Sequence, residues 1–293
     1  MGVVCSGPAV ITPYTKNSQI LTTLQSKKFS TLYTISERIL SDTPSIQIRL
    51  CKQTSSNKIY VLKILKSSTT SLEPQILKTL NHAKIIKFIQ SFSNPLQTLI
   101  ILEYSPFGDL GQYLMKSGKV TENLALSIIY QVLLGLSYLH SFGIYHRDIK
   151  PENIFINSIS DTGIECKIGD FDSAGYIRSR DKEPYGTLPY MAPEIFDQKY
   201  DEKVDVWSCG VLLFKLITGH LLFYGKNPEE IELKIRTANL SFPSFLSKPV
   251  KDLLLSLLTR DPSARIKAHQ ALLHPCLLPI NELSENNNIT INT

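Results

Sequence analysis

The chain of 293 residues is poor in cysteine, and its five cysteines are widely spaced without a CxxC pair. A disulfide framework or a zinc site is therefore not expected, and a reducing, cytoplasmic compartment is the default. No stretch approaches the roughly 18 uninterrupted apolar residues of a membrane span. The first residues lack the basic and apolar regions of a secretory signal, so no signal peptide is expected.

A large excess of charge of one sign is also lacking. The sequence has 31 basic and 26 acidic residues, a formal net charge of +5, and 43% hydrophobic residues. This composition excludes a disordered chain, and 14 glycines with 16 prolines exclude a collagen-like one. A surplus of five charges spread over the whole chain does not make a basic face, so no nucleic-acid partner is expected. The length allows one large globular domain or two small ones.

Short β-branched runs in the first third of the chain predict strands. Ile46, Ile48 and Leu50 alternate with polar residues, and the runs IYVLKIL and TLIILEY follow. No comparable pattern is present in residues 1 to about 30 or in the last dozen residues, which are polar. We therefore expect strands in the first third and loose segments at both ends.

From Thr121 onward the apolar residues recur with a helical period. The run TENLALSIIYQVLLGLSYLHSFG predicts a helix, with Thr121 as its N-cap and Gly143 as its terminator. A second helix is expected in DEKVDVWSCGVLLFKLITG, before Gly219. The sequence thus predicts a small strand-rich part followed by a larger helical part.

The densest polar cluster is the run HRDIKPEN at residues 146–153. Its Asp148, Lys150 and Asn153 place a carboxylate, an ammonium and an amide on an irregular loop, where they can converge on one point. Asp170 follows in the run IGDFD, and GTLPYMAPE closes the polar segment after it. These groups are candidates for chemistry.

These elements, in this order and at these separations, resemble the catalytic loop, the metal-binding motif and the end of the activation segment of the protein kinases. The resemblance implies an α+β, bilobal fold with a small β-rich N-lobe and a larger helical C-lobe. The kinase domain is expected at residues 31–278, with lobes of about 31–103 and 104–278. Flexible tails are expected at residues 1–30 and 279–293.

The resemblance implies an ATP-dependent serine/threonine protein kinase that acts on protein substrates. Asp148 would orient the substrate hydroxyl and accept its proton, while Lys150 would neutralise charge on the γ-phosphate. Asn153 and Asp170 would hold Mg²⁺, a hard cation that prefers oxygen ligands. The lysine in HRDIKPEN is the form typical of serine/threonine kinases.

The resemblance also implies a nucleotide site. Lys63 in YVLKIL is similar to the strand lysine that holds the α- and β-phosphates of ATP, and Glu73 is similar to the helix glutamate that pairs with it. Further nucleotide contacts are implied for the following residues: Ile48, Val61 at the adenine roof, Glu103 and Ser105 in the hinge, Asp109 at the ribose, and Phe155 as the floor.

Glycine is missing from the segment where the resemblance requires it. A loop of the form GxGxxGxV is expected before Lys63, but the sequence reads ILSDTPSIQI. Glycines let main-chain N–H groups close on phosphates, whereas Pro44 has no N–H. The hydroxyls of Ser41, Thr43 and Ser45 remain as alternative donors.

Two further departures concern Asp172 and Pro74. Asp172 stands where the metal motif normally ends in glycine, and it would either add a metal ligand or repel the triphosphate. Pro74 follows Glu73 directly, which predicts a short helix that starts there with Glu73 at its edge. The retained Lys63, Asp148, Asn153 and Asp170 favour a working enzyme, and the alternative is a pseudokinase that acts as a signalling scaffold.

The activation segment contains candidate regulatory residues. In many kinases a phosphorylated residue three positions before the Gly-Thr pair engages the arginine before the catalytic aspartate. Here Glu183 occupies that position before Thr187, so a permanent carboxylate could contact Arg147. The alternative is that Glu183 is an exposed charge with no such role. Ser179 and Tyr185 are possible modification sites.

The first residues fit the pattern for N-terminal myristoylation, with Gly2 as acceptor. A palmitoyl group on Cys5 would convert marginal binding into stable peripheral membrane attachment. The alternative is an unmodified start without such a function. A monomeric protein is expected.

Overall fold

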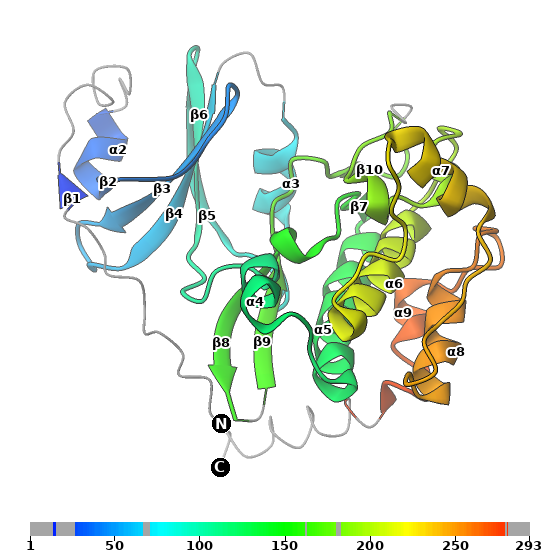
Figure 1. The fold of residues 1–293 in the computed structure, drawn as a ribbon. Helices are drawn as coiled ribbons and strands as arrows, with labels where there is room; N and C mark the ends of the chain where they lie inside the picture. The colour runs from blue at the N-terminus through cyan, green and yellow to red at the C-terminus, as the bar shows by residue number, and fades with distance from the viewer. Residues whose placement is uncertain are drawn as a thin grey trace. The chain divides into compact units, whose positions relative to one another are not determined.

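The computed structural model describes residues 14–15, 27–66, 71–161, 163–179, 183–278 and 280. They fall into two compact units, which we call the N-lobe and the C-lobe (Figure 1). The N-lobe runs to Asn81 and includes Ile86–Phe107, whereas the C-lobe takes His82–Ile85 and the chain from Gly108 onward. The expected α+β fold, with a strand-rich N-lobe and a larger helical C-lobe, is confirmed.

The N-lobe is built on a β-sheet whose strands, within the described residues, follow the order β1-β2-β3-β4-β6-β5. Neighbouring strands are antiparallel, and the runs rich in β-branched residues form the central ones. The elements are β1 (Tyr14–Thr15), α2 (Lys27–Leu32), β2 (Tyr33–Asp42), β3 (Ile46–Gln53), β4 (Ile59–Lys66), α3 (Glu73–Thr79), β5 (Phe88–Asn94) and β6 (Gln97–Glu103).

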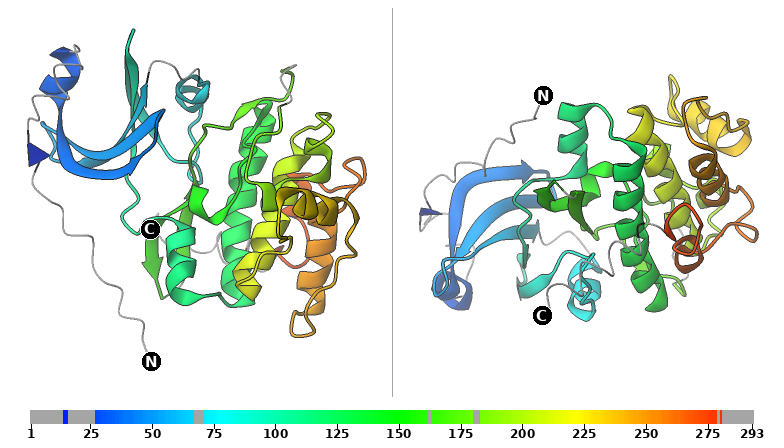
Figure 2. Two further views of the ribbon diagram at one scale, coloured as in Figure 1. Left: turned by 45° about the horizontal axis from the view of Figure 1, so that its top comes forward. Right: turned by 90° about the horizontal axis from the view of Figure 1, so that it is seen from below.

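An apolar core lies on one face of this sheet. Leu62 and Ile64 of β4 belong to it together with Phe29 of α2, and α2 lies beside the sheet in Figures 1 and 2. Because successive side chains of a strand alternate between faces, Lys63 lies on the opposite face. Strand β1 and the first turn of α2 fall within residues 1–30, which corrects the expected flexible tail at these positions.

The C-lobe is mainly helical and contains two short antiparallel strand pairs, β7 with β10 and β8 with β9. Its elements are α4 (Leu110–Ser117), α5 (Glu122–Ser141), β7 (Ile144–Tyr145), η1 (Pro151–Asn153), β8 (Ile154–Ser160), β9 (Gly163–Ile168), β10 (Gly175–Tyr176), η2 (Leu188–Tyr190), η3 (Pro193–Ile195), α6 (Lys203–Thr218), α7 (Pro228–Thr237), α8 (Lys248–Leu257) and α9 (Ala268–Ala271).

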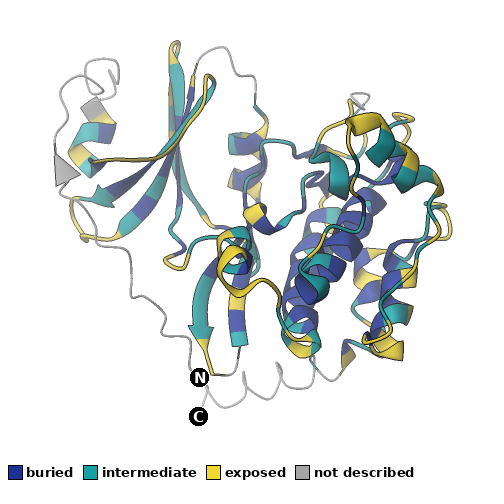
Figure 3. Cartoon of the chain, in the orientation of Figure 1, coloured by how far each residue is buried: buried dark blue, intermediate teal, exposed yellow. Residues whose placement is uncertain are grey.

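Helices α5 and α6 pack against each other and are the most deeply buried helices of the C-lobe in Figure 3. The Thr121 hydroxyl accepts the Leu124 N–H at 3.3 Å and caps α5, which ends just before Gly143 with its φ of +67°. Helix α6 ends at Gly219, which adopts a left-handed conformation. These predicted helix ends are confirmed.

Helix α5 is also the one helix of the described residues that is long and apolar enough to cross a membrane. Most of its apolar window is buried inside the protein. Core helices meet the same criterion, so this observation is weak support for a membrane span.

Candidate active site

The predicted catalytic loop follows β7 and is fixed by the carboxylate of Asp205 on α6. This carboxylate accepts the main-chain N–H of His146 at 2.8 Å and that of Arg147 at 2.7 Å, and it lies 2.9 Å from His140 Nε2. Burial alone raises the pKa of Asp205, but the hydrogen bond and charge of His140 bring it below its ordinary value. Arg147 has a φ of +68°, a costly conformation for a residue with a side chain, which persists where surrounding bonds fix it.

The loop brings Asp148, Lys150 and Asn153 together, and Thr187 of the activation segment joins them. Asp148 Oδ1 accepts the Thr187 hydroxyl at 2.7 Å, and Asp148 Oδ2 lies 2.7 Å from Lys150 Nζ. Lys150 Nζ also donates to Thr187 Oγ1 at 2.7 Å, while Asn153 Nδ2 donates to Asp148 Oδ2 at 2.9 Å. These charge-assisted bonds hold the carboxylate in one orientation. A carboxylate held in this way can accept a proton from a hydroxyl group placed against it.

Asn153 and Asp170 are linked through the main chain next to them. The Asn153 carbonyl accepts the N–H of Gly169, the residue before Asp170, at 2.9 Å. Strand β8, which follows Asn153, pairs with strand β9, which precedes Asp170. Asp170 has a φ of +57°. Because Asn153 bonds Asp148 through its amide nitrogen, its amide oxygen is the atom suited to a cation. An amide oxygen and a carboxylate form a donor set that fits Mg²⁺.

The N-lobe contains an ion pair between Lys63 on β4 and Glu73 on α3. Lys63 Nζ lies 2.8 Å from Glu73 Oε2, and both side chains are buried. Helix α3 begins at Glu73, carries Pro74 in its first turn and ends at Thr79, as the predicted short helix requires. The position of Glu73 at the helix edge therefore does not prevent it from reaching Lys63.

Four other residues with predicted nucleotide contacts lie in the N-lobe. Ile48 of β3 is directly opposite Lys63 of β4, and Val61 lies two residues before Lys63 on the same face. Glu103 ends β6; its N–H donates to the Lys87 carbonyl at 2.9 Å, and its carboxylate accepts the Lys87 N–H at 3.1 Å. Ser105 follows and is buried. The sheet thus places Ile48, Val61 and Lys63 on one face.

Asp109 and Phe155, the remaining two, lie opposite each other in the C-lobe in an isolated β-bridge. Asp109 caps helix α4, since its Oδ1 accepts the Gln112 N–H at 2.8 Å and its Oδ2 accepts the Gln112 side-chain amide at 2.6 Å. Burial raises the pKa of Asp109 above its ordinary value, against the effect of these bonds. The capping role of Asp109 is one that the sequence comparison with kinases did not indicate.

Arg147 is a point of contact between the catalytic loop and the activation segment. Its guanidinium lies 4.8 Å from the ring centre of Tyr145 and 4.1 Å from that of Tyr185. Arg147 Nη1 donates to the Tyr200 hydroxyl at 3.2 Å, and this hydroxyl donates to the main-chain carbonyl of Glu183 at 2.7 Å. The main chain of Glu183 is therefore linked to Arg147 through the Tyr200 hydroxyl. The contact between the Tyr185 ring and Arg147 was not predicted from the sequence.

The glycine-free hairpin between β2 and β3 is closed by its own polar groups. The Thr43 N–H donates to the Ile46 carbonyl at 2.8 Å, and the Thr43 hydroxyl donates to that carbonyl and accepts the Ile46 N–H, both at 3.0 Å. Lys66 Nζ donates to the Thr43 carbonyl at 2.8 Å and lies 3.7 Å from the Asp42 carboxylate. The Thr43 hydroxyl, which was expected as a phosphate donor, is therefore engaged in the turn.

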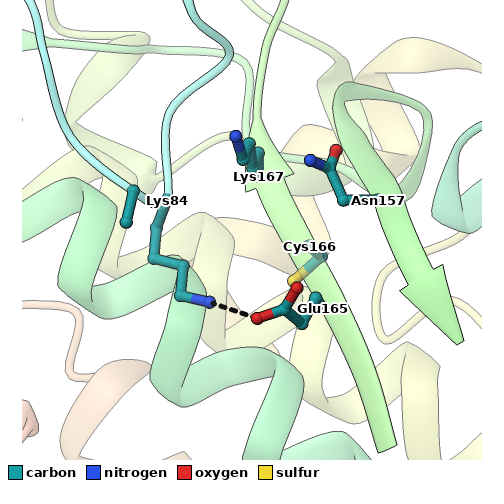
Figure 4. A pocket seen from close by; sticks show the side chains of 6 residues that line it. Lys84, Asn157, Glu165, Cys166 and Lys167 are labelled. Atoms are coloured by element: carbon teal, nitrogen blue, oxygen red, sulfur yellow. Dashed lines mark ion pairs between the residues drawn. The ribbon is translucent and has the colours of Figure 1, made fainter. Parts of the chain in front are cut away.

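A pocket of about 250 Å³ lies in the C-lobe and is shown in Figure 4. Lys84 points toward Glu165 in this view, at 4.0 Å, and also donates to Gln131 at 2.9 Å. Burial raises the pKa of the Cys166 thiol to about 12, so the thiol is protonated at neutral pH. None of the residues with predicted catalytic roles lines this pocket, whose lining residues are Ala83, Lys84, Asn157, Glu165, Cys166 and Lys167.

The model of the protein kinase domain family matches residues 45–277 of this chain, and the chain therefore belongs to the protein kinase family. This agrees with the resemblance that the motifs indicated, and the fold and the catalytic-loop geometry are consistent with it.

Several curated proteins are similar to the chain. It is 35% identical over 217 residues to the probable serine/threonine-protein kinase HSL1 of Saccharomyces cerevisiae, covering 71% of this chain and 14% of that protein. It is 34% identical over 217 residues to CBL-interacting protein kinase 11 of Oryza sativa subsp. japonica, covering 72% and 42%. It is 32% identical over 243 residues to the serine/threonine-protein kinase PEPKR2 of Arabidopsis thaliana, covering 79% and 50%. The chain thus spans half or less of the length of these relatives.

Proposed function

We propose that this chain is a serine/threonine protein kinase, which transfers the γ-phosphate of ATP to serine or threonine hydroxyls of protein substrates. The observation that carries the proposal is the Asp148 carboxylate, which Thr187 and Lys150 hold at 2.7 Å. Relatives named as serine/threonine-protein kinases support it. The lysine at position 150 supports a serine or threonine acceptor, because this form of the loop is typical of kinases with that specificity.

In this proposal the chain acts mainly by positioning the reactants and by compensating charge. Asp148 orients the attacking hydroxyl and accepts its proton, and Lys150 supplies positive charge for the oxygens of the transferred phosphoryl group. Lys63, held by Glu73, binds the α- and β-phosphates. Each of these groups is fixed by a partner before the substrates bind, which reduces the cost of reaching the reactive arrangement.

Mg²⁺ is the metal that the family implies, and Asn153 with Asp170 would hold it. When bound, the metal ion neutralises charge on the phosphate oxygens. The bond from Asn153 to Asp148 at 2.9 Å also ties the proposed metal ligand to the proposed proton acceptor. A change at either residue is therefore expected to disturb both functions.

The competing function is that of a pseudokinase scaffold without phosphoryl transfer. The hairpin between β2 and β3 favours it, because Pro44 has no N–H and the Thr43 hydroxyl is bonded within the turn. Loss of one preorganised donor costs about 10²–10³ in rate, so this defect slows a kinase without abolishing its activity. The intact Asp148 site and the names of the relatives favour the kinase.

One experiment separates the two functions. The purified chain and its Asp148→Ala variant are incubated with labelled ATP, Mg²⁺ or Mn²⁺ and a panel of protein substrates. We expect incorporation by the wild type and a loss of at least 10²-fold in the variant, the scale of a general base. Equal incorporation by both would reject the kinase, and a thermal-shift titration with ATP would then test nucleotide binding by the scaffold.

The remaining predictions about partners and location rest on the sequence. Gly2 and Cys5 lie outside the described residues, so acylation and peripheral membrane attachment stay predictions, as do a cytoplasmic location and a monomeric state. Mass spectrometry of native protein tests the acylation directly. A free or simply acetylated Gly2 would reject it.

A further inference from the structure

We propose that Tyr185 is a positioning residue of the catalytic loop. By stacking on Arg147, it holds Thr187 against Asp148 without a phosphate group on the activation segment. This inference rests on the proposed kinase function and adds to it a positioning role that the motifs do not give to Tyr185.

The guanidinium of Arg147 is enclosed by neighbouring groups, and the residue is only 7% exposed. The rings of Tyr145 and Tyr185 lie 4.8 and 4.1 Å away, and Arg147 Nε donates to the Ser173 carbonyl. The absence of a side chain at Gly175 provides space for this guanidinium, because a Cβ at this position would come within 2.9 Å of Arg147 Nη2. The guanidinium is therefore packed on several sides, and Tyr185 is the part of this packing that the activation segment contributes.

Among the contacts between the catalytic loop and the activation segment, two are made by successive residues of the loop. Arg147 contacts Tyr185, and the next loop residue, Asp148, accepts the Thr187 hydroxyl at 2.7 Å. Between these contacts lies Gly186, with a φ of +118° and a position at which a Cβ would overlap the Arg147 carbonyl oxygen. The absence of a side chain at Gly186 therefore lets the two segments approach closely between these contacts, and loss of the Tyr185 contact is expected to loosen the Thr187 contact.

The ring, rather than its hydroxyl, is the group that the inference requires. A buried cation needs compensation, and the face of an aromatic ring supplies it through its negative electrostatic potential. The Tyr200 hydroxyl and the Ser173 carbonyl accept hydrogen bonds from the same guanidinium. With these partners Arg147 is compensated by uncharged groups, so an added phosphate is not needed to hold it.

The test compares Tyr185→Ala, which removes the ring, with Tyr185→Phe, which keeps it. Because Arg147 is buried but Tyr185 is 37% exposed, the cation–π contact predicts that Tyr185→Ala lowers kcat about 3- to 30-fold. The KM for ATP is expected to be unchanged, because the proposed ATP contacts are made by other residues. The kcat of Tyr185→Phe is expected to stay within about twofold of that of the wild type. The wild-type protein is expected to keep its activity after phosphatase treatment.

A matched control is Tyr224→Ala. Like Tyr185, Tyr224 is exposed and makes a cation–π contact, since Lys234 Nζ lies 4.9 Å from the centre of its ring. Neither Tyr224 nor Lys234 has a proposed catalytic role. We expect its kcat to equal that of the wild type. A second readout, hydrogen exchange of the amides of residues 183–191 in the unliganded chain, should be faster in Tyr185→Ala only.

The outcomes are separable. Wild-type kcat and exchange in Tyr185→Ala would overturn the inference, as would equal losses in the Ala and Phe variants of Tyr185 or loss of all wild-type activity on phosphatase treatment. If the wild type transfers no more phosphate than Asp148→Ala, the proposed kinase function fails. Hydrogen exchange then still tests whether Tyr185 holds Thr187 in place. Faster exchange in Tyr185→Ala alone would support this role, and unchanged exchange would overturn it.

Discussion

The two lobes each contain a lysine–carboxylate pair, and the pairs are held in different ways. Lys63 and Glu73 of the N-lobe join a strand to a helix at 2.8 Å, with side chains only 5% and 0% exposed. Lys150 and Asp148 of the C-lobe lie in one loop at 2.7 Å and are 21% and 12% exposed. The first pair is almost fully removed from water, whereas the second is partly exposed and Thr187 also bonds both of its members. Burial therefore makes the N-lobe pair the more sensitive one.

The largest effect is expected from Glu73→Gln, which breaks the buried pair of the N-lobe. Removal of one charge from this buried pair is expected to destabilise the protein by about 3–5 kcal/mol. Displacement of Lys63 is expected to lower kcat/KM for ATP by about 100-fold. Urea unfolding followed by tyrosine fluorescence, together with initial rates, measures the two effects.

The control for this prediction is the double variant Lys63→Met with Glu73→Gln. It removes both charges, so stability should return toward the wild type while activity stays low. If Glu73→Gln alone kept wild-type stability, the buried pair would have no structural role.

A smaller effect is expected from Asp205→Asn, which weakens the support of the catalytic loop. Asparagine cannot provide two charged acceptors for the N–H groups of His146 and Arg147, which costs about 1–3 kcal/mol at pH 7. Because the pKa of Asp205 is lowered in the folded protein, its contribution is present above the unfolded pKa of about 3.9. It is lost as the pH falls through the lower folded value.

The difference in unfolding free energy between wild type and Asp205→Asn should therefore shrink below about pH 4. Urea unfolding at pH 7, 4 and 3 measures it, with the exposed Asp161→Asn as control. A difference that stayed constant over this range would contradict the assigned role of the Asp205 charge.

The smallest effect is expected from Lys66→Ala, which touches neither pair but releases the hairpin between β2 and β3. The side chains of Lys66 and Asp42 are 45% and 48% exposed, so stability should change by less than about 1 kcal/mol. Exchange of the Thr43 and Ile46 amides should become faster, because the Lys66 bond to the Thr43 carbonyl is lost.

The exposed Lys78→Ala on α3 serves as the control for Lys66→Ala. Mass spectrometry of hydrogen exchange distinguishes the hairpin from the rest of the sheet. A large loss of stability in Lys66→Ala would show that the hairpin supports the Lys63 pair, and would remove the contrast between the lobes.

The elements that the sequence predicted well are those specified by nearby residues. Thr121 and Gly143 mark the ends of α5 because capping and a left-handed turn are local properties. The same holds for the loop that carries Asp148, Lys150 and Asn153, since their spacing alone allows them to converge. Local chemistry of this kind can be read without knowledge of the fold.

The missed features depend on contacts between residues that are distant in the sequence. Helix α2 has six residues and no apolar period, and its Phe29 is placed by packing against the sheet. The stacking of Tyr185 on Arg147 and the bond from Lys66 to Thr43 likewise require the folded chain. No spacing rule connects these residues, so only the structure could show them.

The position of Phe29 has a practical consequence for any shortened form of this protein. The ring is fully buried, and its centre lies 5.5 Å from the rings of both Tyr33 and Phe92. Removal of a buried phenylalanine ring costs about 3–5 kcal/mol, a large share of the stability of an ordinary domain. A version that started at residue 31, where the kinase domain was expected to begin, would lack this ring and expose part of the apolar core on one face of its sheet to water.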